Sequence, residues 1–187
     1  MVLALGGAVA ALGALLLLDL LNLGHPVLDP VAHVVSYLVH ARAGWLLAVV
    51  GAGCAVAAFA VVPRLRRGPA VAVAVFGAGL LVAGLVPTQP YGDWSGPSVA
   101  TLVHGLGGWV GFLALPVAAW LARRDVPWWP GLVSAGLVVV LAVGTVEVVD
   151  GPDHLGHVLG LAERLMIAAD LVWLVAGAAT LRGRAVG

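Results

Sequence analysis

Six long apolar stretches dominate this sequence of 187 residues and decide what it can fold into. A helix needs about 20 apolar residues to cross the hydrocarbon core of a bilayer. The mean hydropathy of +1.10, with 62% apolar and 10% charged residues, lies far outside the range of soluble domains. We therefore predict an all-α, polytopic membrane bundle that forms one domain over residues 1–187. Its six transmembrane helices are predicted at about 2–21, 43–63, 69–87, 99–122, 128–149 and 158–181.

The charged residues between these stretches predict the orientation of the bundle. Cytoplasmic connections of membrane proteins collect arginine and lysine. Arginines follow the second, fourth and sixth stretches, whereas histidines lie in or beside the alternate connections, so both termini are expected in the cytoplasm. Arg42 and Arg164 fall on the predicted outer side and need partners or water there. The inner arginines are Arg64, Arg66, Arg67, Arg123, Arg124, Arg182 and Arg184, and the histidines are His25, His33, His40, His104, His154 and His157.

The first apolar stretch is predicted to remain as a membrane anchor. It lacks the positive amino-terminal region and the A-x-A-like cleavage site of a secretory signal peptide. The formal net charge of zero gives no indication of nucleic-acid binding. Cys54 is the single cysteine, so one chain can form neither a disulfide nor a thiolate metal site.

The first outer connection contains a candidate amphipathic helix. Asp29 followed by Pro30 is a favourable N-cap and first helical position. Asp29, His33, Ser36 and His40 follow at spacings of four, three and four, which places them in one polar stripe on a helix. We expect this short helix either to lie on the outer membrane surface or to fold over the bundle as a lid.

The other outer connections and one helix carry further signals. Residues 87–97 contain three prolines and two glycines, and this turn is expected to present Asp93 and Trp94 over the mouth of the bundle. In the third outer connection, Asp153 is placed to cap the last helix. Gly107 and Gly111 are four residues apart, so a neighbouring backbone can approach closely there.

Ionisable residues within the predicted helices are candidates for function. Such groups cost about 2.5–3.5 kcal/mol each at the centre of a membrane helix. Most of them lie within about two turns of the outer boundary, which predicts a polar cavity open to the outside; Asp170 lies roughly 10 Å deeper than Glu163. The candidates are Asp19, His104, Glu147, Glu163, Arg164 and Asp170.

Two interpretations of this polar group stay open. In the first, it performs acid–base chemistry or binds a polar head, because desolvation and the Arg164 charge separate the pKa values of neighbouring carboxyls. In the second, Arg164 is neutralised by Glu147 or Glu163, and the pair holds the last two helices together.

A metal site is a weaker alternative on the same side of the membrane. His154 and His157 are three residues apart at a helix start, with Asp93 and Asp153 as further zinc ligands. An HxxH spacing alone is a weak motif. The sequence has no phosphate loop, nucleophile elbow or haem motif, so no cofactor is expected.

Three segments have the character of family signatures. They are Asp29-Pro-Val-Ala-His-Val-Val-Ser36 through Gly44-Trp45, Gly84-Leu-Val-Pro-Thr-Gln-Pro90 with Thr101-Leu-Val-His104-Gly, and Gly160-Leu-Ala-Glu163-Arg164-Leu through Trp173. Together these segments resemble the bacterial integral membrane proteins of the DUF998 family, a domain of unknown function. The resemblance implies a compact bundle of six or more helices and little about activity. Where the family often carries Phe-Pro-x-Asp, this chain has Gln89 in place of the acid, and Asp93 follows a turn later.

The leading functional hypothesis is a membrane protein that binds an amphiphilic substrate, such as a lipid or isoprenoid, and that would transform it if it is an enzyme. Small membrane cyclases and isomerases use carboxylic acids in this way, which is an analogy of architecture. A small-solute or proton-coupled transporter and a non-catalytic accessory subunit are the alternatives. The residues expected to act on the head are Asp93, His104, Glu147 and Glu163, and those expected to bind the substrate are Asp19, Trp94, Arg164, Asp170 and Trp173.

Overall fold

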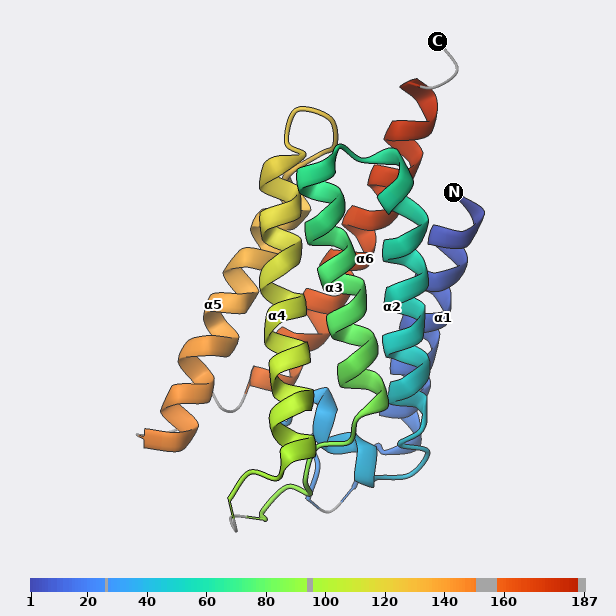
Figure 1. Cartoon of the computed structure of the whole chain (residues 1–187). Helices are drawn as coiled ribbons and strands as arrows, with labels where there is room; N and C mark the ends of the chain where they lie inside the picture. The colour runs from blue at the N-terminus through green and yellow to red at the C-terminus, as the bar shows by residue number, and fades with distance from the viewer. Residues whose placement is uncertain (26, 94–95, 151–157, 185–187) are drawn as a thin grey trace.

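The computed structural model describes residues 1–25, 27–93, 96–150 and 158–184, with the backbone alone at 146–150 and 184. Within these ranges the chain is helical, as predicted, and contains no strand (Figure 1). The elements are α1 (Val2–Leu21), the 3-10 helix η1 (Val35–His40), α2 (Leu46–Val61), the 3-10 helix η2 (Val62–Arg64), α3 (Arg67–Leu85), α4 (Val99–Leu121), α5 (Trp129–Asp150) and α6 (Leu159–Arg184).

Among the described residues, five helices are long and apolar enough to cross a membrane: α1, α2 with η2, α3, α4 and α6. The apolar part of α5, Trp129–Thr145, is shorter. Each α-helix begins and ends within three residues of a predicted apolar stretch. The multi-pass membrane character of the chain is thereby confirmed.

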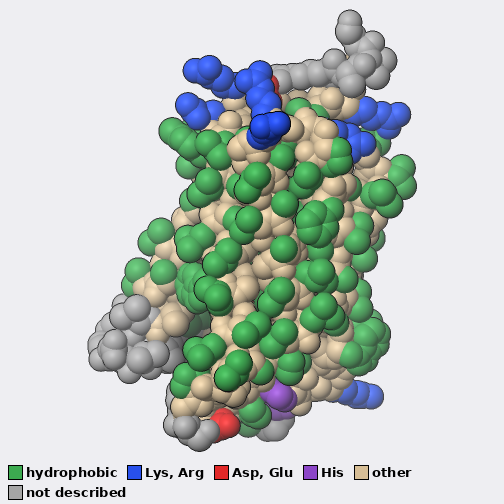
Figure 2. Space-filling model, viewed as in Figure 1, with side chains coloured by type: hydrophobic (Ala, Val, Ile, Leu, Met, Phe, Trp, Pro, Cys, Tyr) green, Lys and Arg blue, Asp and Glu red, His purple; other side chains and the backbone are tan. Residues whose placement is uncertain are grey.

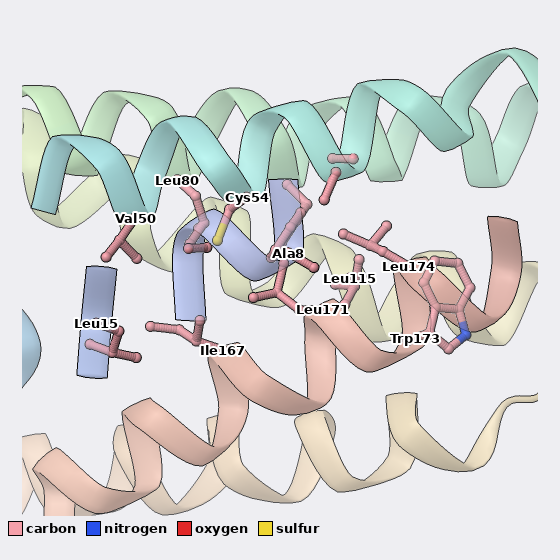
Figure 3. Packing of buried hydrophobic residues seen from close by; sticks show 14 of the residues in the cluster. Ala8, Leu15, Val50, Cys54, Leu80, Leu115, Ile167, Leu171, Trp173 and Leu174 are labelled. Atoms are coloured by element: carbon pink, nitrogen blue, oxygen red, sulfur yellow. The ribbon is translucent and has the colours of Figure 1, made fainter. Parts of the chain in front are cut away.

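The helices pack in two groups. Helices α1 to α4 contact one another in chain order, whereas α5 and α6 form a hairpin whose second helix also reaches α1 and α2 (Figure 1). Leu15 of α1, Val50 of α2 and Ile167 of α6 extend toward the same interior region (Figure 3). Contacts between α4 and α5 are sparse compared with those between α3 and α4.

Glycines set the close approach of neighbouring helices in the first group. A Cβ atom added to Gly79 of α3 would lie 2.5 Å from the carbonyl oxygen of Gly107 and 2.9 Å from the Cα of Gly111. Between α1 and α2, a Cβ on Gly7 would lie 2.6 Å from the carbonyl oxygen of Gly53. The predicted packing role of Gly107 and Gly111 is confirmed, since only residues without a side chain allow these backbones to touch.

The two ends of the bundle carry different charges. The N-terminus and the end of α6 lie at the same end (Figure 1), and Figure 2 shows arginine side chains gathered there. The α1–α2 connection (residues 22–45) and the α3–α4 connection (residues 86–98) lie at the opposite end, which we call the histidine end.

The α1–α2 connection does not form the α-helix that was expected to begin at Asp29. Residues 30–32 form a turn, and the regular element is the six-residue 3-10 helix η1. The cause is competition from α6: the Val31 carbonyl accepts the Leu161 N–H at 2.9 Å, and the Val35 N–H donates to Glu163 at 2.5 Å. Both groups of the helical 35-to-31 hydrogen bond are therefore used elsewhere. With Val35 and Leu38 buried in the core, the connection folds over the bundle as a lid.

Candidate functional site

A cavity of about 470 Å³ lies at the histidine end, between the α1–α2 connection and helices α2 to α6. Most of its lining is apolar, with Leu80 of α3, Phe112 of α4, Leu141 of α5 and Ile167 of α6 among the lining residues. The polar side chains are concentrated toward the two connections and the adjoining helix ends. Those that line the cavity are His33, Ser36, Tyr37, Tyr91, His104, Thr145 and Glu163.

Glu163 is held in the lining by the lid. It lies in the second turn of α6, and its Oε2 accepts the Val35 backbone N–H at 2.5 Å. One turn earlier, the α6 N–H groups of Gly160 and Leu161 donate to carbonyls of the connection, at 3.3 and 2.9 Å. The first turns of α6 and the lid therefore satisfy each other's backbone groups, and this fixes the Glu163 carboxylate at the cavity wall.

His104 lines the same cavity, and its hydrogen bond defines which ring nitrogen carries the proton. Its Nδ1 lies 2.8 Å from the carbonyl oxygen of Val86, at the end of α3. A carbonyl oxygen can only accept a hydrogen bond, so Nδ1 carries the proton. In the neutral ring, Nε2 then keeps a lone pair and can accept a proton or a hydrogen bond.

Three aromatic rings from the two connections meet beside these groups. The His33 and Tyr91 ring centroids are 4.5 Å apart and those of Tyr37 and Tyr91 are 5.1 Å apart, both in edge-to-face geometry. Burial raises the pKa of the Tyr37 phenol, and negative charge at Tyr91 and Glu163 raises it further. Tyr37 therefore stays neutral and lies within electrostatic reach of the Glu163 carboxylate.

Arg164 is paired with Asp19 and, within the described residues, forms no salt bridge with Glu163; the expected alternative partner, Glu147, has its side chain outside those residues. Its Nε and Nη2 donate to the two Asp19 carboxylate oxygens at 2.8 and 2.6 Å. Its Nη1 donates to the carbonyls of His33 at 3.2 Å and Gly160 at 2.9 Å. This bidentate pair joins the end of α1 to the start of α6 and the lid.

Arg42, the other arginine at this end, has an exposed side chain. Its backbone is fixed instead: the Asn22 side chain accepts the Arg42 N–H at 3.0 Å and donates to the Arg42 carbonyl at 2.9 Å. Buried Asn22 thus ties the two ends of the α1–α2 connection together.

Asp170 and Trp173 lie deeper, outside the cavity lining. Both are fully buried, and Ser134 of α5 lies beside Asp170. Within the described part of the chain, neither the Asp170 carboxyl, the Ser134 hydroxyl nor the Trp173 indole N–H has a hydrogen-bond partner of good geometry. The sequence analysis did not single out Ser134, although it is an isolated hydroxyl in a long apolar stretch.

The remaining expected residues fall elsewhere. Asp93 is not among the residues that line the cavity, and its backbone carbonyl accepts the Gln89 side-chain N–H at 2.7 Å. The Glu147 side chain lies outside the described residues. So do Trp94, Asp153, His154 and His157. In the part of the chain that the structure covers, no three His, Cys, Asp or Glu side chains could hold a metal ion.

Two glycines of α4 form a further part of the site that sequence reasoning missed. Gly105 and Gly108 line the cavity, and a Cβ added to either would meet no atom within 4 Å. They differ from Gly107 and Gly111 only in the helix face on which they lie. The sequence could not predict which glycines line a cavity, because the chain contains 26 glycines.

Comparison with known proteins identifies the family of the chain. No curated protein and no solved structure matches it. The profile of one family, described as protein of unknown function (DUF998), matches residues 4–180 and so covers nearly the whole bundle. The chain therefore belongs to the DUF998 family of proteins of unknown function.

Proposed function

We propose that this protein binds an amphiphilic molecule in the cavity at the histidine end of the bundle. The cavity volume carries the proposal: about 470 Å³ falls within the roughly 300–1,000 Å³ range of small-molecule sites. Its apolar wall suits a hydrocarbon tail, and Glu163, His104 and the tyrosines suit a polar head. A lipid or isoprenoid-like molecule has both parts.

The arginine distribution supports an extracytoplasmic position for this site. Arginine-rich ends of membrane proteins face the cytoplasm. Arginines are gathered at the end that carries both termini. The termini therefore lie on the cytoplasmic side of a cell membrane, and the cavity lies on the outer side. The bound molecule would then come from the outer leaflet or from outside the cell.

Acid–base chemistry is the reaction class that this site supports. His104 Nε2 is available as a base, and the Glu163 carboxyl can take up or release a proton on the same cavity wall. Glu163→Gln and His104→Gln would abolish turnover in a protein that still folds. Retained turnover in both variants would limit the function to binding.

A transport function is the second candidate, and the Asp170–Ser134 pair favours it. An ionisable carboxyl that is fully buried at membrane depth is typical of an ion or proton path. Proton or solute flux in liposomes that disappears with Asp170→Asn would support this alternative.

Filling the cavity tests the binding proposal. We expect Gly108→Leu to place a side chain in open space, so that the bundle folds normally but the cavity closes. The probe is hexadecanol with a photoreactive diazirine in its chain, in nanodiscs, with labelled peptides identified by mass spectrometry. Wild type should be labelled on the cavity faces of α4 and α6, and Gly108→Leu should lose that labelling.

Gly13→Leu is the matched control for this experiment. Gly13 is exposed on α1, where an added Cβ also meets no atom within 4 Å. The control should label as wild type does, because it adds the same side chain away from the cavity. Equal labelling of Gly108→Leu and Gly13→Leu would contradict binding in this cavity.

A further inference from the structure

The charge of the cavity lining restricts the head group that it can accept. Glu163 is the only carboxylate among the described lining residues, and no arginine lies among them. The nearby guanidinium of Arg164 is already bound by both oxygens of Asp19. Within the described residues Glu163 forms no salt bridge, and the Arg164 charge acts on it only through space; a cation bound in contact with this partly buried carboxylate would offset the cost of burying it.

Backbone donors do not reverse this charge. An anionic head needs N–H groups or cations, and the Val35 N–H is already donated to Glu163. Two backbone donors in the turn of α6 before Glu163, Gly160 and Leu161, are likewise bound to carbonyls of the lid. The site therefore offers a phosphate or sulfate head no free cation and none of these N–H groups.

Aromatic rings supply the second half of a cation site. His33, Tyr37, Tyr91 and Trp109 line the same cavity as Glu163, and the Tyr91 ring contacts the rings of both His33 and Tyr37. The faces of such rings attract ammonium groups, with an energy of about 0.5–2 kcal/mol for each pair. The Glu163 carboxylate lies close to this aromatic group, because it accepts the N–H of Val35, two residues before Tyr37, and lines the same cavity.

Building on the proposed function, we propose that the bound amphiphile carries an ammonium head. The ammonium group lies between the Glu163 carboxylate and the aromatic rings of Tyr37 and Tyr91. The tail runs along the apolar wall formed by α3, α4, α5 and α6. The same chemistry is offered by an amine lipid of the membrane and by a cationic amphiphile that arrives from outside.

Competition between head groups tests this inference. The photoreactive hexadecanol probe is bound to wild type in nanodiscs of digalactosyl diacylglycerol, a neutral lipid without an amine, and displaced with dodecyltrimethylammonium, dodecanol or dodecyl sulfate. We expect dodecyltrimethylammonium to displace the probe at about tenfold lower concentration than the other two, which corresponds to about 1.4 kcal/mol. Equal potency of the three competitors would overturn the ammonium head and leave binding intact, whereas a probe that fails to label the cavity would overturn the proposed function as well.

Glu163→Gln tests the charge of the side chain without removing its contact with the lid. The glutamine side-chain oxygen can still accept the Val35 N–H, so the lid contact is kept while the negative charge is removed. We expect the advantage of dodecyltrimethylammonium over dodecanol to disappear in this variant. Asp29→Asn is the control: it also removes one negative charge, from the α1–α2 connection that packs on Glu163, but Asp29 lies outside the lining, so the preference should remain.

Tyr91→Leu provides an independent variant, because Tyr91 lies on an exposed connection and its replacement spares the helices. It should weaken displacement by dodecyltrimethylammonium more than displacement by dodecanol; an equal change would count against the aromatic contribution.

Mass spectrometry of lipids that co-purify with wild type distinguishes the two sources of the ligand, the membrane and the outside of the cell. A retained amine lipid assigns the membrane as the source, and an empty site that still prefers the added cation assigns the outside.

Discussion

Glycine residues have opposite effects on two faces of α4. On one face, Gly107 and Gly111 bring α4 into backbone contact with Gly79 of α3. On the other face, Gly105 and Gly108 meet nothing where a side chain would be, and the space they leave belongs to the cavity. Glycine thus permits tight packing of α3 on one face of α4 and leaves cavity space beside the other face.

This difference divides the bundle into a rigid part and an adjustable part. The rigid part is the row α1 to α4, where neighbouring backbones touch at glycines. The adjustable part is the histidine end between α4 and the α5–α6 pair, where α4 has few contacts with the other two helices and the lid is fixed by polar contacts. Packed backbones tolerate little change, whereas polar contacts at a cavity rim can be altered singly.

The largest expected effect comes from Gly79→Leu, which breaks the rigid part. Its side chain would start 2.5 Å from one backbone atom and 2.9 Å from two others, so α3 and α4 must separate. We expect the free energy of unfolding to fall by about 3 kcal/mol or more, at the upper end of overpacking costs. Unfolding in SDS, followed by circular dichroism, measures it. Gly13→Leu should unfold as wild type does, and equal stability of the two variants would show that this helix contact is not tight.

The sequence predicted the helices well because each needs only local information. About 20 apolar residues in a row suffice to predict a span, and the ends of α1 coincide with the predicted 2–21. The presence of Glu163 and His104 in one cavity follows from their common depth in the membrane, which the sequence also contains.

The contacts between helices could not be predicted in the same way. The partner of Arg164 is Asp19, 145 residues away, and nothing in the sequence gives the rotation of α6 relative to α1. The lid was expected to be α-helical because its polar residues have helical spacing, but α6 takes up its hydrogen-bonding groups. The glycines show the same limit, since residue type alone does not distinguish a contact from a void.

The second prediction uses Asp19→Asn to test whether the lid opens independently of the row α1 to α4. Asp19→Asn leaves the Arg164 guanidinium without a charged partner in a largely buried position, where the two side chains are 11% and 19% exposed. Loss of one member of such a pair costs about 3 kcal/mol. We expect hydrogen exchange to accelerate at residues 30–35 of the lid, with little change in α2 and α3. A uniform increase over the whole bundle would show that the lid and the glycine-packed row unfold as one unit.

The smallest effect concerns Tyr37, which reports on the charge at the cavity. The chain has two tyrosines, so Tyr91→Phe leaves the Tyr37 phenol as the only one to ionise. Since burial and the Glu163 charge raise the pKa of Tyr37, its phenolate absorbance should appear above the ordinary value of about 10. Adding Glu163→Gln should lower the Tyr37 pKa toward that value, because the nearby negative charge is lost.

The raised Tyr37 pKa also gives the sign of a stability change. The unfolded chain releases the phenol proton at lower pH than the folded chain does, so this contribution to stability is complete below about pH 10 and is lost as the pH rises through the folded pKa. The Tyr91→Phe protein should therefore lose stability in this alkaline range more steeply than a variant that also carries Tyr37→Phe. A Tyr37 pKa that stays the same in the Glu163→Gln background would place the carboxylate too far from the aromatic rings to share a bound cation with them. The same titration that detects the smallest effect thus decides whether the lid and α6 form one site or two.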